Sequence, residues 1–196
     1  IPTPYDAELA ELSTKVNDTY IAYGQNGAAG KGRQSAQDSN AAGAAPSVAA
    51  QRAVTKANAS YNNAGWDLVD ATKEGVRIQI VDNEGSEIFR LGSDEPTERA
   101  RQIIRLVCEN IRDRDNRIVI EGHTDSAPFK SGQKTNWELS TSRASAARRE
   151  LENNGIEPSR VAKVIGYADQ EPLFKENPRD LRNRRISIIL LQEDRR

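Results

Sequence analysis

An acidic and a basic side chain occupy positions from which both could contact one charged ligand. Asp125 follows a short apolar run, and Arg143 lies two turns into a helix that the pattern predicts from Asn136. Because Arg143 is seven residues after Asn136, these two side chains share one helix face. Ligands of α/β proteins commonly lie just beyond the carboxyl ends of strands, where Asp125 is expected. The spacing therefore predicts that the three side chains line the same edge of a sheet.

The chemistry of these side chains suits a zwitterionic ligand. A carboxylate accepts hydrogen bonds from an ammonium group, whereas a guanidinium presents a planar pair of donors to a carboxylate. An amide such as that of Asn136 both donates and accepts. A free amino-acid centre carries both charged groups, so we expect a ligand of that class. Two other interpretations remain open. The Asp125 side chain could serve merely to cap a turn. Arg143 could instead form a surface ion pair with Glu138 or Glu150.

The sequence offers little for catalysis or metal binding. It contains one histidine and one cysteine, which argues against a zinc site, although His123 and Asp125 share a strand face. It contains neither the Gly-x-Ser-x-Gly turn of a serine hydrolase nor a glycine-rich phosphate loop. We therefore expect no metal, no cofactor and no enzymatic reaction. His123 is expected to be a hydrogen-bonded strand-end residue, and Cys108 a small buried hydrophobic residue.

Alternating strand and helix patterns predict an α/β sandwich over the last two thirds of the chain. A hairpin is expected first, and Val76, Ile78 and Ile80 share one face of its second strand. A helix follows, whose buried apolar stripe is expected to be Ala100, Ile103, Ile104, Val107 and Ile111. A strand, a second helix and two further strands complete the order. We expect a mixed β-sheet with the two helices packed on one face. Trp137, near the start of the second helix, is expected to pack there, with glycan stacking as the alternative. The expected elements are Trp66–Ala71, Val76–Val81, Pro96–Arg114, Ile118–Ile120, Asn136–Asn154, Val161–Tyr167 and Ile186–Leu191.

The first third of the chain differs in composition from the rest. Residues 1–21 carry one thin apolar stripe at helical spacing, which predicts a short amphipathic helix. Residues 22–63 are rich in Ala, Gly, Ser and Asn without an apolar period, which predicts a flexible linker. The folded domain is expected to span residues 64–196. No stretch is apolar enough to cross a bilayer, so any membrane anchor is expected upstream of this sequence.

The charge balance argues against nucleic acid as a partner. The chain has 28 basic and 29 acidic residues, for a net charge of −1. Binding to nucleic acid requires a surplus of Lys and Arg, which this sequence lacks. We therefore expect no nucleic-acid partner.

Three motifs resemble the OmpA-like peptidoglycan-associating domain. They are Gly122-His123-Thr124-Asp125, Asn136-x-x-Leu139-Ser140-x-x-Arg143-Ala144 and the closing Asn183-Arg184-Arg185. The particular forms Asn136-Trp137-Glu138-Leu139-Ser140 and Gly166-Tyr167-Ala168-Asp169 are similar to the MotB branch, the flagellar motor stator subunits. The wider family usually has Gly where this chain has Ala168. The resemblance covers Trp66 to about Gln192.

The resemblance implies non-covalent binding of the diaminopimelate-containing stem peptide of peptidoglycan, in the periplasm. It assigns the principal contacts to Asp125 and Arg143, with Asn136 in support and Arg184 at the border of the site. Thr124 and Leu139 belong to the matching motifs and are carried over with them. The stator branch further implies a homodimer, an inner-membrane helix upstream and a channel partner subunit. The same domain would also serve an OmpA-like or Pal-like envelope-stapling protein, and a wall hydrolase is the enzymatic alternative.

Overall fold

The computed structural model describes residues 11–12, 14–15, 68–129, 132 and 134–192. Residues 11–12 and 14–15 are helical, and the Leu12 side chain is buried in the hydrophobic core. The rest of the expected N-terminal helix and the whole expected linker lie outside the described residues.

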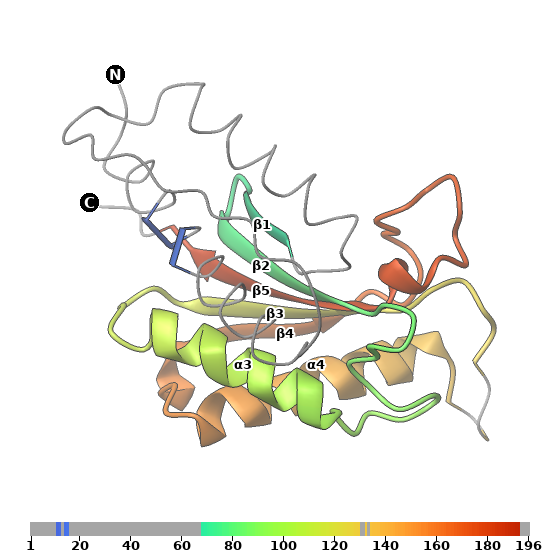
Figure 1. The fold of residues 1–196 in the computed structure, drawn as a ribbon, viewed down its shortest axis with the longest axis horizontal. Helices are drawn as coiled ribbons and strands as arrows, with labels where there is room; N and C mark the ends of the chain where they lie inside the picture. The colour runs from blue at the N-terminus through green and yellow to red at the C-terminus, as the bar shows by residue number, and fades with distance from the viewer. Residues whose placement is uncertain (1–10, 13, 16–67, 130–131, 133, 193–196) are drawn as a thin grey trace, which may run out of the picture.

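Five strands form one mixed sheet in the described part of the chain. The strands are β1 (Leu68–Ala71), β2 (Gly75–Val81), β3 (Ile118–His123), β4 (Val161–Gly166) and β5 (Arg185–Leu191), in the order β1-β2-β5-β3-β4. Only the β3–β4 pair is parallel. Helices α3 (Glu98–Ile111) and α4 (Asn136–Asn153) cover one face of the sheet (Figure 1). The predicted sandwich is confirmed, with element bounds within about three residues, whereas the central place of β5 was not predicted.

The core forms where the apolar sides of the strands meet the two helices. Strand β2 contributes Val76, Ile78 and Ile80 to this core, because alternate residues of a strand face the same side. The predicted apolar stripe of α3 is buried throughout. Cys108 lies on this stripe with no exposed surface, as predicted, and burial raises the pKa of its thiol to about 12.

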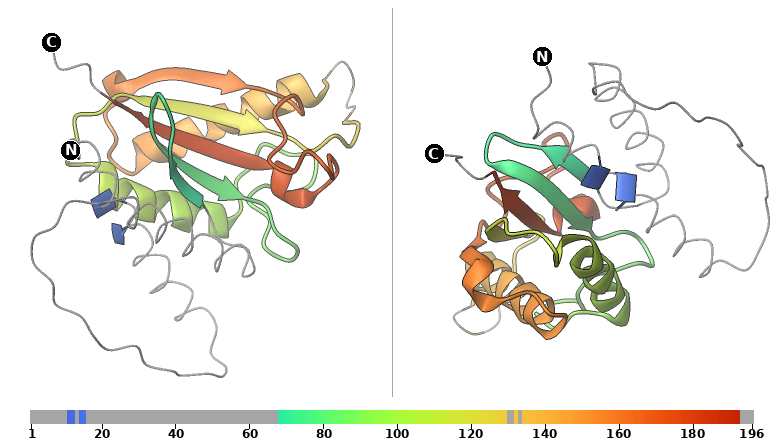
Figure 2. Two further views of the ribbon diagram at one scale, coloured as in Figure 1. Left: turned by 90° about the horizontal axis from the view of Figure 1, so that it is seen from above. Right: turned by 90° about the vertical axis from the view of Figure 1, so that its left-hand side faces the viewer.

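Two glycines let α4 lie directly on β3 and β4 (Figure 2). A Cβ atom at Gly122 would stand 2.1 Å from the Ser140 carbonyl oxygen, and one at Gly166 would stand 2.2 Å from Thr141 Oγ1. Neither separation is possible between real atoms, so any larger residue would displace the helix. The close contact fixes the start of α4 beside the ends of both strands.

Four strand ends meet at the edge of the sheet where α4 begins. Val81, the last residue of β2, and His123, the last residue of β3, both lie opposite Arg185, the first residue of β5. Gly166 at the end of β4 lies opposite Gly122. Residues that follow β2, β3 and β4, or precede β5, are therefore brought together here.

None of the helices in the described part is both long and apolar enough to span a membrane.

Candidate ligand-binding site

Four charged residues gather at this edge, and we call them the strand-end cluster: Asp82, Asp125, Arg143 and Arg184. They come from the end of β2, the loop after β3, helix α4 and the residue before β5. Asp82, Asp125 and Arg143 are 3%, 8% and 5% exposed, and the Arg184 side chain is 17% exposed. Two carboxylates and two guanidinium groups balance to zero. Buried charges of this kind are tolerated only when they are paired.

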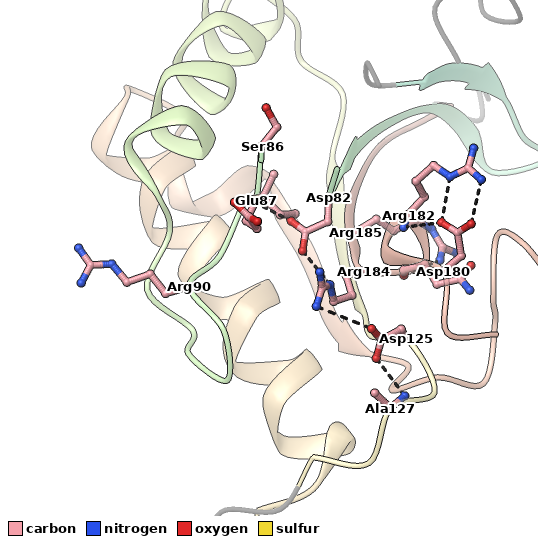
Figure 3. Close-up of polar contacts among 12 residues, drawn as sticks. Asp82, Ser86, Glu87, Arg90, Asp125, Ala127, Asp180, Arg182, Arg184 and Arg185 are labelled. Carbon is pink, nitrogen blue, oxygen red and sulfur yellow. Dashed lines mark hydrogen bonds and ion pairs between the residues drawn. The ribbon is translucent and has the colours of Figure 1, made fainter. Parts of the chain in front are cut away.

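Arg184 lies between the two carboxylates of the cluster (Figure 3). Its Nε atom is 2.9 Å from Asp82 Oδ2, and its Nη1 atom is 3.7 Å from Asp125 Oδ2. The contact with Asp82 is an ion pair without the alignment of a hydrogen bond. The guanidinium therefore connects strand ends that are far apart in the sequence.

Asp125 both caps a turn and takes part in the cluster. Its Oδ1 atom accepts a hydrogen bond of 3.0 Å from the Ala127 backbone N–H. Asn136 donates through Nδ2 to the carbonyl oxygens of Ala127 at 3.1 Å and Asp125 at 3.4 Å. The turn interpretation and the site interpretation of Asp125 are thus compatible, and Asn136 holds the loop that carries the carboxylate.

Arg143 belongs to the same cluster but points its donors at the loop between β2 and α3. Its Nε atom donates to Ser93 O at 2.9 Å and its Nη2 atom to Arg90 O at 3.5 Å. Its Cζ atom lies 5.0 Å from the centroid of the Phe89 ring. Burial lowers the pKa of Arg143, and the nearby carboxylate of Asp82 opposes this effect most strongly. Arg143 therefore also holds the loop in place.

The surface-pair interpretation of Arg143 is wrong. Glu138 instead accepts hydrogen bonds from Thr135 in the capping box of α4, and Glu150 pairs with Arg101 at 3.4 Å. The cation paired with Asp125 is Arg184 rather than Arg143. Arg184 also pairs with the carboxylate of Asp82, which is nearer to it than that of Asp125.

Thr124 and Leu139 lie beside the cluster and are both buried, at 3% and 8% exposed. Thr124 donates its backbone N–H to Ala168 O at 2.8 Å, while its Oγ1 atom has no hydrogen-bond partner. Leu139 is one helical turn before Arg143 on α4. All six predicted site residues are thus close to the same edge, and the side chains of four of them make polar contacts: Asp125, Asn136, Arg143 and Arg184.

Asp82 is a member of the cluster that the sequence did not reveal. Its Oδ1 atom accepts a 2.6 Å hydrogen bond from the Ile88 N–H. Burial raises its pKa, against the lowering effects of the Ile88 amide and the Arg184 guanidinium. The available signal was a carboxylate directly after the run Gln79-Ile80-Val81. This carboxylate could be assigned to the cluster only with the knowledge that β5 lies next to β2.

His123 ends β3 as predicted, but its expected hydrogen bond and the expected packing of Trp137 are both wrong. His123 is 2% exposed, but neither ring nitrogen has a hydrogen-bond partner, and Glu121 Oε2 lies 3.6 Å from Nε2. Its ring stacks on Tyr167 at a centroid distance of 5.2 Å. Trp137 was expected to pack, yet it is 51% exposed. Within the described part of the chain, no three His, Cys, Asp or Glu residues are grouped so that they could hold a metal ion.

Comparison with known proteins identifies the family. The model of the OmpA family matches residues 88–185, which is half of the chain. The chain belongs to the OmpA family. The matched region of this OmpA-family chain includes Asp125, Arg143 and Arg184 of the strand-end cluster, whereas Asp82 precedes it.

Motility protein B of Escherichia coli K12 is 41% identical to this OmpA-family chain over 127 residues. The alignment covers 64% of this chain and 41% of the relative, so the chain spans less than half of that protein's length. The periplasmic domain of Helicobacter pylori MotB has a TM-score of 0.57 at 19% identity, covering 65% of this chain and 83% of the other. The cell wall anchor of the Pseudomonas aeruginosa T6SS has a TM-score of 0.56 at 24% identity, covering 69% and 94%. These two structures establish a shared fold.

The backbone of Ala168 has an unusual conformation, at a position where the resemblance leads us to expect Gly. Ala168 adopts a φ of 50°, in the left-handed region where Gly is favoured. Its amide donates to Ser140 Oγ at 3.0 Å, and its carbonyl accepts from Thr124 N. These contacts, from α4 and from the residue after β3, hold the backbone in a conformation that a residue with a Cβ atom seldom adopts.

Proposed function

We propose that this chain binds the stem peptide of peptidoglycan without covalent chemistry and anchors a flagellar motor stator to the cell wall. The observation that carries the proposal is the strand-end cluster, formed in an OmpA-family chain that is 41% identical to a motility protein. The domain would act in the periplasm, as part of a dimer. It would be connected to an inner-membrane channel partner by an upstream helix.

The charges of the cluster are arranged for a ligand that is itself zwitterionic. Asp125 accepts an ammonium group, and Arg184 lies next to it with donors for a carboxylate. Because the cluster has no net charge, a ligand with one ammonium and one carboxylate leaves the balance unchanged. The free centre of diaminopimelate in a stem peptide carries both groups.

The test is sedimentation of the protein with purified peptidoglycan. Asp125→Asn keeps the acceptor for the Ala127 N–H but loses the charge, so we expect binding to weaken about tenfold or more. Asp70→Asn is the matched control, because Asp70 pairs with Arg77 across β1 and β2 on the other face of the sheet. Circular dichroism should be unchanged in both variants.

Two outcomes would contradict the proposal. If the unmodified protein stays in the supernatant, it does not bind peptidoglycan. If Asp125→Asn binds as well as Asp70→Asn, the site is elsewhere. Binding without turnover is part of the proposal, so prolonged incubation should release no soluble wall fragments.

A further inference from the structure

We infer that Asp82 is a positioning residue of the peptidoglycan site, which holds Arg184 in the orientation that receives the carboxylate of the ligand. This inference rests on the proposed function. Asp82 lies outside the region that the family model matches. Its part in the site follows from the contacts at the end of the sheet.

The backbone places Asp82 and Arg184 directly beside each other. The ladder between β2 and β5 continues past Val81 and Arg185, because the Asp82 N–H donates to Arg184 O at 2.9 Å. Their side chains meet on the side of the sheet that also carries Arg143, and Asp82 Oδ2 is 2.9 Å from Arg184 Nε. Carboxylate and guanidinium are thus fixed by paired strands rather than by a mobile loop.

The second oxygen of Asp82 fixes the carboxylate itself. Oδ1 accepts the 2.6 Å hydrogen bond from Ile88, a residue of the core with 2% exposure. At 3% exposure, Asp82 has little freedom to turn toward solvent. It can therefore set the orientation of Arg184, whereas the more exposed Arg184 side chain alone could adopt several rotamers.

The position of Asp82 also resolves a repulsion within the cluster. Arg143 and Arg184 are close enough that the charge of Arg184 lowers the pKa of Arg143. Asp82 acts on both guanidinium groups with the opposite sign. The Nε atom of Arg184 faces Asp82 and its Nη1 atom faces Asp125 (Figure 3). A ligand whose ammonium group binds Asp125 would therefore bring its carboxylate close to Arg184.

The experiment is a double-mutant cycle on the whole chain, with binding to purified peptidoglycan and to meso-diaminopimelate as readouts. Asp82→Asn keeps an acceptor for Ile88 but not the charge that holds Arg184, so we expect about tenfold weaker binding. Arg184→Gln should lose at least as much. If Asp82 acts through Arg184, the double variant should bind like Arg184→Gln alone. Asp70→Asn is again the control.

The outcomes separate positioning from a purely structural role. A structural role would lower the melting temperature of Asp82→Asn while its binding loss multiplied with that of Arg184→Gln, and this result would overturn the inference. Wild-type affinity in Asp82→Asn would also overturn it, leaving the proposed function intact. If the unmodified protein binds no peptidoglycan, both fail. If Asp82→Asn does not fold, Arg184→Gln decides: full binding by that variant refutes a role for Arg184, and with it the role of Asp82.

Discussion

Single residues in this domain differ sharply in how their charge is compensated. The four members of the strand-end cluster neutralise one another, so the buried carboxylate of Asp82 has both a cation and an amide as partners. His123 was expected to share a strand face with Asp125, but it lies on the face of β3 away from α4, because the neighbouring Gly122 faces that helix. Neither of its ring nitrogens has a hydrogen bond. A charge on a buried group without hydrogen-bond partners is costly, so protonation of His123 would destabilise the folded state.

His123 should make the stability of the domain depend on pH. Burial lowers its pKa, and Arg185 adds to this effect while Glu121 and Glu171 oppose it. Because the folded pKa lies below the unfolded value of about 6.5, the unfolded chain takes up the proton first. The contribution of His123 to the free energy of unfolding is therefore fully present above about pH 6.5, and it is lost as the pH falls toward the folded pKa.

The variant His123→Phe isolates this contribution. Phe keeps a ring to stack on Tyr167 and removes the titration, so it should change the free energy of unfolding at neutral pH by less than about 1.5 kcal/mol. Urea unfolding between about pH 5 and 8 should show a smaller pH dependence than in the unmodified protein. Parallel pH profiles for both proteins would show that His123 does not titrate on unfolding.

At the scale of elements, the site depends on how closely α4 approaches the sheet. The helix carries Asn136 and Arg143, each bonded to carbonyl groups of a different loop. Its distance from β3 is set by Gly122. A displacement of α4 would therefore move both loops and the cluster between them.

Gly122→Ala should destabilise the domain and weaken binding together. The added Cβ would stand 2.1 Å from Ser140 O and 3.3 Å from Ala144 Cβ, so α4 must move. We expect a loss of about 1–3 kcal/mol in the free energy of unfolding, as in other overpacked cores. Thermal unfolding and peptidoglycan sedimentation measure the two effects.

Gly85→Ala is the comparison for this variant. A Cβ at Gly85 meets nothing within 4 Å, so the cost comes only from its φ of 71° and should be about 1 kcal/mol. Wall binding should be unaffected by Gly85→Ala. Equal effects of the two substitutions on binding would show that the spacing of α4 does not matter for the site.

The elements were predictable from the sequence because each one carries its own signal. The alternation in β2, the stripe of α3 and the face shared by Asn136 and Arg143 are all local patterns, and the structure has them. The order of the strands is not local, since it depends on which apolar faces pair across long separations. Asp82 was missed for that reason: only the insertion of β5 beside β2 brings it to Arg184. The hydrogen bonds of Arg143 to the loop carbonyls were missed for the same reason.

At the scale of the whole molecule, the proposed binding site carries no net charge, and the protein around it is nearly neutral. The net charge of the chain is −1, which provides almost no long-range attraction for a charged polymer. The cluster also cancels its own field beyond its immediate surroundings. Under the proposed function, attachment to the wall would come from short-range contacts between paired groups.

This balance predicts that wall binding changes little with salt. Contacts between buried or half-buried charges are screened much less than contacts between exposed ones. We expect the dissociation constant for purified peptidoglycan to change less than about threefold between roughly 0.05 and 0.5 M NaCl. Asp125→Asn, measured at the same salt concentrations, gives the non-specific background. A tenfold or larger weakening would mean that exposed Lys and Arg side chains, and not the strand-end cluster, hold the polymer, because only charges open to solvent lose their attraction so steeply.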